Sequence, residues 1–171
     1  AGLQRDAGGI NRFEHNRAPA SVDKQTVIRM NRDTLYSFAV VDVSAGATLM
    51  IPDAGDRYLS VMVVNEDHYI NRVLHGEGRY DLTADDVGGP YAVVAARTLV
   101  DPQDPADLAS VAAIQDQLLL SAAADRPFVL PDYDTESLDR TRKALLTLAS
   151  DMTSFESTFG RKEDVDPVHH L

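Results

Sequence analysis

The stretch "NRDTLYSFAVVDVSAGATLMIPD", residues 31–53, decides the fold. It begins with polar residues and continues into a run rich in β-branched and aromatic side chains, which is typical of a β-strand. Gly46 separates that run from a second strand-like run, and Pro52 opens a tight turn because proline presets the backbone angle φ. The stretch therefore predicts two strands joined by a short turn.

Similar strand-like runs flank this stretch. Together the runs occupy residues 26–30, 34–43, 47–51, 57–65, 68–75, 79–83 and 91–100. About seven short strands separated by turn residues indicate an antiparallel sandwich or barrel. The run at 57–65 is apolar on both faces of a period-two pattern, which predicts an inner strand. We therefore predict a mainly β fold, an antiparallel β-sandwich at 26–100 that follows an irregular segment at 1–25.

After the sandwich we predict a small helical element, which is a pair of helices within residues 103–160. With these helices the overall class is α+β. Asp104 is a candidate N-cap with Pro105 at the first helical position, and Asp134 or Thr135 is a candidate cap for the second helix. Apolar residues at helical spacing predict a buried face on each helix. These faces comprise Leu108, Val111, Ala112, Leu118 and Leu119 on the first helix, and Leu138, Leu145, Leu148, Ala149 and Met152 on the second.

The composition narrows the choice of partners. The chain of 171 residues has a formal net charge of −11 and no cysteine, so no disulfide framework is present. The negative charge argues against nucleic acid and against an anionic membrane surface as partners. No apolar run approaches the ~20 residues that span a bilayer. We expect a soluble, acidic, cytoplasmic protein that acts on neutral or cationic small molecules, and we leave a periplasmic or secreted location open.

The polar residues that open the stretch at 31–53 are the first candidate site. Asn31 and Asp33, two residues apart, point to the same side of a strand. Together they could hold a hard cation or accept hydrogen bonds from a hydroxyl-rich ligand. The alternative is structural, because Asn and Asp commonly form turns that satisfy backbone donors at the start of a strand.

The segment "NEDHY", residues 65–69, is the second candidate site. If the strand continues here, Glu66 and His68 alternate onto one face, where both could reach one divalent metal ion. Without a metal, His68 could act as a general base that Glu66 or Asp67 orients, and Asp33 is a further candidate catalytic residue. A metal site normally needs three protein ligands, so two on one face are a weak motif. The alternative is a polar strand end with a structural histidine.

Aromatic and basic residues are candidates for lining a ligand pocket. Tyr36, Tyr69 and Arg72 each combine an apolar body with a polar tip, although packing at the edge of a sandwich would use the same residues. His15 lies among charged residues before the sheet and is interpreted as a surface or packing histidine. No nucleophile elbow, phosphate loop or dinucleotide fingerprint is present.

The stretch "NRDTLYS" followed by "DAGDRYLSVMVVNEDHY" is long and specific. Through these residues, and through most of the chain from Gly9 to Leu171, the sequence resembles the bacterial "domain of unknown function 1254" family. The resemblance implies an N-terminal β-sandwich and a helical element. It also implies that the charged tail at 161–171 leads to a second, jelly-roll-like domain, "domain of unknown function 1214". On this interpretation the chain is a truncated copy, and the family implies no particular reaction.

Two functional hypotheses remain open after the sequence analysis. The first is a small-molecule binding module, or half of an enzyme site completed by a second domain and suited to metal-assisted hydrolysis. The second is a non-catalytic recognition or structural module, and homo-oligomer assembly through strand edges is a weaker third. Convergence decides between the first two: if His68, Asp33 and one more acidic or histidine side chain meet, the enzyme hypothesis gains.

Overall fold

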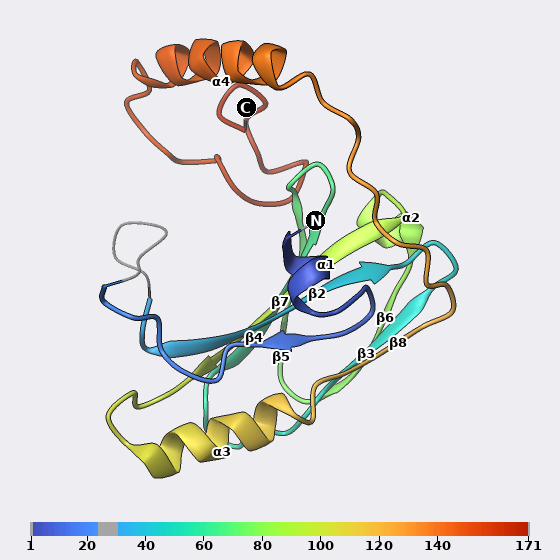
Figure 1. The fold of residues 1–171 in the computed structure, drawn as a ribbon, viewed down its shortest axis with the longest axis vertical. Coiled ribbons are helices and arrows are strands. Elements are labelled where there is room, and N and C mark those ends of the chain that lie inside the picture. Colours follow the sequence, from blue (N-terminus) through green and yellow to red (C-terminus); the bar gives the residue numbers. More distant parts are fainter. Residues whose placement is uncertain (1, 24–30, 171) are drawn as a thin grey trace.

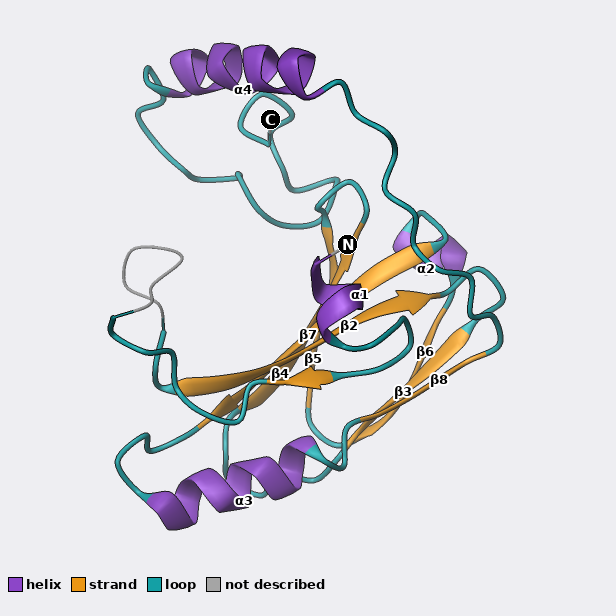
Figure 2. Ribbon diagram, in the orientation of Figure 1, coloured by secondary structure: helices purple, strands orange, loops and turns teal. Residues whose placement is uncertain are grey.

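The structure, a computed structural model, describes residues 2–23 and 31–170 and contains two antiparallel β-sheets (Figure 1, Figure 2). Its strands are β1 (Glu14–His15), β2 (Thr34–Asp42), β3 (Ala47–Ile51), β4 (Leu59–Asn65), β5 (Ile70–His75), β6 (Gly78–Leu82), β7 (Tyr91–Leu99) and β8 (Leu119–Ala122). The predicted strand at 26–30 lies outside the described residues. The helices are α1 (Gly2–Asp6), α2 (Ala84–Val87), α3 (Pro105–Gln115) and α4 (Thr135–Ala149).

The two sheets pack against each other through one shared core. The five-stranded sheet has the order β1-β2-β7-β4-β5, and the three-stranded sheet has the order β6-β3-β8. Alternate side chains of β2, such as Ala39 and Val41, enter the core and meet Leu49 of β3 and Val61 of β4. The predicted class, a mainly β antiparallel sandwich with a helical element after it, is confirmed, and β4 is the inner strand that its apolar pattern indicated.

Helix α3 closes one end of the sandwich. Asp104 caps it and Pro105 is its first residue, as the sequence predicted, because an N-cap side chain accepts a free backbone N–H and proline needs none at that position. Val111 of α3 packs against Leu35 of β2 and Val100, which follows β7. This contact fixes α3 beside the first residues of β2.

The chain after α3 returns to the sheet. Strand β8 pairs with β3, so the expectation that Leu118 and Leu119 lie on a helical buried face is wrong. Leu118 instead enters the core of the sandwich, and Leu119 is exposed. Pairing with β3 satisfies the backbone hydrogen-bonding groups of this segment. The spacing of apolar residues alone does not predict that the segment becomes an edge strand.

Helix α4 exposes the face that the sequence predicted to be buried. None of its residues is buried, and Leu138 and Leu148 are 52% and 69% exposed. Its N-cap is Asp134, as predicted. Figure 1 shows α4 at the opposite end of the molecule from α3, so the two helices do not pack as a pair. Helical spacing identifies which residues share a face but does not show that a partner covers it.

Among the described residues, no helix is long and apolar enough to span a membrane.

The five-stranded sheet has a second face, which points away from the three-stranded sheet. Because side chains alternate along a strand, the burial of Ser37 in β2 places its neighbours Tyr36 and Phe38 on this outward face, where both are partly exposed. Antiparallel pairing continues the same face onto β7 and β4. The outward face is the part of the fold that matters for the site described below.

A buried carboxylate ties the end of β2 to a distant connector. The Asp42 side chain is fully buried; it accepts hydrogen bonds from the Ser44 backbone N–H at 3.0 Å and from the Arg126 backbone N–H at 3.0 Å. The Arg126 guanidinium adds an ion pair at 3.1 Å. Burial opposes ionisation of Asp42, but the hydrogen bonds from Arg126 and Ser44 outweigh it and hold the pKa of the carboxyl well below its usual value.

Replacement of Asp42 by Asn should lower the free energy of unfolding at pH 7 by about 1–3 kcal/mol, because charge-assisted hydrogen bonds are lost from a buried site. A carboxyl with a lowered folded-state pKa contributes its stability above the unfolded pKa of about 4 and loses it as the pH falls further. Urea unfolding at pH 7 and at about pH 3 should therefore show a smaller difference between parent and variant at the lower pH. The exposed Asp132→Asn is the control, and an equal loss at both pH values would contradict the assignment.

Candidate functional site

The two predicted site segments lie at opposite ends of the five-stranded sheet. Thr34, next to Asp33, pairs with Leu99 at one end of β7, whereas Asn65, next to Glu66, pairs with Ala92 at the other. The separation along β7 is on the order of 20 Å, at ~3.3 Å for each residue of a strand. The convergence of Asp33 with His68, which the enzyme hypothesis required, is therefore absent.

Asn31 and Asp33 form a hydrogen-bonded turn at the start of β2. The Asn31 Oδ1 accepts a hydrogen bond from the Asp33 backbone N–H at 2.7 Å, and the Asp33 carbonyl accepts one from the Val100 N–H at 2.8 Å. The Asp33 side chain is exposed and makes no hydrogen bond or ion pair within the described part of the chain. These contacts agree with the structural role that the sequence offered as an alternative for Asn31 and Asp33. A catalytic role for Asp33 stays a prediction.

Glu66 and His68 lie in a turn, and the expectation that they alternate along a strand is wrong. Strand β4 ends at Asn65, whose Oδ1 accepts hydrogen bonds from the backbone N–H groups of Asp67 at 3.1 Å and Tyr69 at 2.9 Å. These bonds fold the chain back into β5, and His68 takes a left-handed conformation with φ of 67°. The asparagine, rather than the acidic residues, determines the shape of this segment.

Glu66 and His68 nevertheless line one depression of about 550 Å³, which we call the turn pocket. Tyr91 and Phe128 contribute aromatic rings to it, with centroids 5.2 Å apart and nearly perpendicular planes. Across residues 2–23 and 31–170, no group of three or more His, Asp or Glu side chains is arranged to hold a metal ion. The metal-binding role of Glu66 and His68 stays a prediction that needs a ligand from elsewhere.

Tyr69 and Arg72 are used in contacts within the chain. The ring of Tyr69 stacks on His170 with centroids 4.2 Å apart, which docks the tail against the turn. The Arg72 guanidinium donates to the Asp81 carbonyl at 3.0 Å and lies 5.9 Å from the ring centroid of Tyr80. Arg72 thereby joins β5 of one sheet to β6 of the other. Their predicted role in ligand binding is untested.

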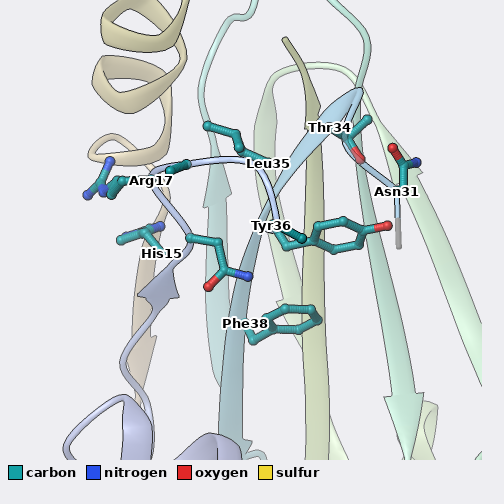
Figure 3. Close-up of a pocket in the computed structure, with 10 residues that line it drawn as sticks. His15, Arg17, Asn31, Thr34, Leu35, Tyr36 and Phe38 are labelled. Atoms are coloured by element: carbon teal, nitrogen blue, oxygen red, sulfur yellow. The ribbon is translucent and has the colours of Figure 1, made fainter. Parts of the chain in front are cut away.

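The larger depression, about 660 Å³, lies beside the first half of β2 (Figure 3). We call it the β2 pocket; it is lined by His15, Asn16, Arg17, Ala18, Ala20, Asn31, Thr34, Leu35, Tyr36 and Phe38. The rings of Tyr36 and Phe38 stack with centroids 5.5 Å apart and planes 9° apart. Figure 3 shows the two rings on the same side of β2, with Asn31 beyond the Tyr36 hydroxyl and His15 on the other side. Of the predicted residues, Asn31 and Tyr36 are thus brought together.

A buried hydrogen-bond chain holds the imidazole of His15 at the wall of this pocket. The Gln115 Nε2 donates to the Ser37 Oγ at 3.2 Å, and the Ser37 Oγ lies 2.8 Å from the His15 Nδ1. Since the Ser37 oxygen already accepts from Gln115, its own proton is available for the His15 Nδ1. With Ser37 as the donor the imidazole carries its proton on Nε2, and with Nδ1 as the donor to Ser37 it carries the proton on Nδ1. We expect the first arrangement. Pairing of β1 with β2 sets His15 opposite Ser37, and α3 supplies Gln115.

The surroundings of His15 favour its neutral form. Burial lowers the pKa of the imidazole below 6.5, and the positive charge of Arg17 lowers it further. Arg17 is itself fixed at the end of α3, because its guanidinium donates to the Ala112 carbonyl at 2.7 Å and pairs with Asp116. At neutral pH the site therefore contains a neutral donor and acceptor ring rather than a cation.

Sequence reasoning missed three residues of this site. Phe38 could have been found, because it follows Tyr36 at the period-two spacing of a strand. Ser37 and Gln115 gave no signal, since their partners are far away in the sequence and meet them only through strand pairing and the packing of α3. His15 was interpreted as a surface or packing histidine, and the structure places it at the wall of the β2 pocket.

The fold and the pocket together define a two-sheet antiparallel sandwich with an open, aromatic-lined pocket beside one sheet edge. The chain belongs to the family described as protein of unknown function (DUF1254), whose model matches residues 10–122. No curated protein matches the sequence.

A similar solved structure is the crystal structure of the VPA0106 protein from Vibrio parahaemolyticus. It superimposes with a TM-score of 0.64 at 15% identity and covers 81% of this chain. This chain covers 54% of the Vibrio chain, so it spans about half of that protein's length. At this identity the likeness concerns the fold.

Long-range proton–nitrogen spectra should show His15 with its proton on Nε2 and with a pKa below 6.5, because burial and the charge of Arg17 both disfavour the imidazolium. Arg17→Gln should raise that pKa, whereas Arg142→Gln on α4, which removes the same charge at a distance, should not. Protonation on Nδ1 would contradict the assignment of Ser37 as the donor, and a pKa at or above 6.5 in the parent protein would contradict the effect of burial and Arg17.

Proposed function

We propose that this chain is a small-molecule binding module whose ligand lies on the stacked rings of Tyr36 and Phe38 in the β2 pocket. The observation that carries the proposal is this pair of partly exposed, stacked rings on the outward face of β2, in a pocket that His15 also lines from the other side of the strand. Ligand pockets are typically lined by aromatic side chains with a few placed polar groups, and this arrangement has that character.

The polar groups of the β2 pocket are suited to orienting a ligand. Among the described residues the Nε2 of His15 has no hydrogen-bond partner, because Ser37 engages only Nδ1. The Thr34 Oγ1 is buried and has no hydrogen-bond partner within the described residues, although Thr34 lines the pocket. A buried hydroxyl without a partner is costly, so a ligand atom or a water molecule at this wall would be favourable.

Binding is favoured over catalysis by the burial of Ser37. Its contact with His15 brings a hydroxyl and an imidazole together, which is the pairing that a serine nucleophile uses. Only 1% of Ser37 is exposed, and its oxygen is shared with Gln115, so a substrate in the pocket does not reach it. This supports a module that recognises a ligand, in line with the non-catalytic alternative.

Metal-assisted hydrolysis has weaker support. Glu66, His68 and Asp6 all line the turn pocket, but within the described ranges no three such side chains are arranged to hold a metal ion. Completion of either pocket by a second domain follows from the family resemblance alone and stays a prediction.

Binding of neutral aromatic probes such as phenylacetamide tests the proposal. Saturation-transfer NMR should detect binding to the parent protein, and Tyr36→Leu or Phe38→Leu should weaken it about three- to tenfold, because stacking on an aromatic face is lost. The matched control is Phe128→Leu, which removes a ring from the turn pocket and should leave the affinity unchanged. Loss in Phe128→Leu with retention in Tyr36→Leu and Phe38→Leu would overturn the proposal.

A further inference from the structure

A row of polar side chains crosses the outward face of the five-stranded sheet next to the aromatic pair. Antiparallel pairing sets Tyr36 of β2 opposite Arg97 of β7, Arg97 opposite Ser60 of β4, and Ser60 opposite His75 of β5. Side chains of directly opposed residues point to the same face of a sheet, so these four positions form one line across four strands. The aromatic pair and the row share Tyr36.

Arg97 is the unusual member of the row. Its guanidinium lies 5.4 Å from the ring centroid of Tyr36, and its Nε is buried without a hydrogen-bond partner. Within the described residues the Arg97 side chain makes no ion pair and no hydrogen bond, whereas the side chains of Arg57 and Arg126 are paired with carboxylates. Other arginines that have no carboxylate partner in the described part of the chain, such as Arg12 and Arg142, are exposed to solvent, whereas Arg97 is partly buried.

Among the described residues of β2, β7 and β4, the outward positions next to Arg97 include no carboxylate, and the acidic residue of the next row is Glu14 of β1, opposite Phe38. The neighbouring outward rows on the central strands carry Thr34 and Leu99 on one side, and Phe38, Ala95 and Met62 on the other. The chain as a whole is acidic and would repel anions, but these rows leave a local positive charge beside an apolar surface.

The remaining polar groups of the row are donors. The Ser60 Oγ accepts a hydrogen bond from the Tyr58 hydroxyl at 2.9 Å, which leaves the Ser60 proton available to an acceptor. His75 is exposed beside Ser60, and its ring lies 6.2 Å from that of Tyr58. The row therefore offers hydrogen-bond donors on both sides of Arg97. The Arg97 guanidinium is the permanently charged group of the row.

We propose that Arg97 binds the carboxylate of an anionic small molecule whose aromatic or alkyl body lies on the Tyr36–Phe38 pair. The Nε is buried, so the carboxylate would meet the two terminal nitrogens, a planar fork that matches its two oxygens. Stacking on Tyr36 holds that fork in place before the ligand arrives, which lowers the entropy cost of binding. A single guanidinium suits a monocarboxylate better than a doubly charged phosphate.

The inference rests on the proposed function, because it names the class of ligand that lies on the same aromatic pair. The test compares phenylacetate with its neutral analogue phenylacetamide by NMR titration at fixed ionic strength. The variants are Arg97→Gln, which removes the charge, and Arg97→Lys, which keeps a charge without the fork. Arg142→Gln on the exposed face of α4 makes the same change in net charge elsewhere. Thermal melting checks that each variant is folded.

The parent protein should prefer phenylacetate to phenylacetamide by about tenfold or more, because hydrogen bonds to charged groups are strong. Arg97→Gln should abolish that preference while phenylacetamide still binds, Arg97→Lys should retain part of it, and Arg142→Gln should retain all of it. Equal affinity for both probes in the parent, or an unchanged preference in Arg97→Gln, would overturn the inference and leave the proposed function intact. Failure of both probes to bind the parent would overturn both.

Discussion

The antiparallel pairing of β2 with β7 is the constraint on which the rest of the structure depends. Every residue of β2, from Thr34 to Asp42, is paired with β7, and this register sends Ala39 and Val41 into the core. The same register sends Tyr36 and Phe38 outward and sets Tyr36 opposite Arg97. A slip of one residue would exchange the two faces, so one pattern of burial specifies both the core and the binding surface.

Residues far apart in the sequence then complete the site. Gln115 reaches Ser37 because α3 packs on the end of β2, and Ser37 in turn orients His15 from the edge strand β1. At the other end of β2, Asp42 fixes the connector that carries Arg126. Buried polar groups thus lock the strand at both ends, which makes the outward surface between them rigid enough to bind a ligand without large reorganisation.

Much of the fold could be predicted from the sequence, because alternation, turn residues and helix caps are local properties. The runs at 47–51 and 91–100 became β3 and β7 with small boundary changes, and both predicted caps were found. The site was less accessible to sequence reasoning, since it depends on which strand ends share an edge. Asp33 and His68 looked like partners but lie at opposite ends of the sheet, whereas Gln115 gave no signal at all.

The acidic composition pointed towards neutral or cationic ligands, and the local surroundings of Arg97 point the other way. The central claim is that the outward face at Tyr36, Phe38 and Arg97 is the ligand-binding surface. The most direct measurement is a crystal structure of the protein with bound phenylacetate. The account predicts the phenyl ring on Tyr36 and Phe38, with its carboxylate at the terminal nitrogens of Arg97. Ordered phenylacetate in the turn pocket at Glu66 and His68, with none on β2, would contradict it.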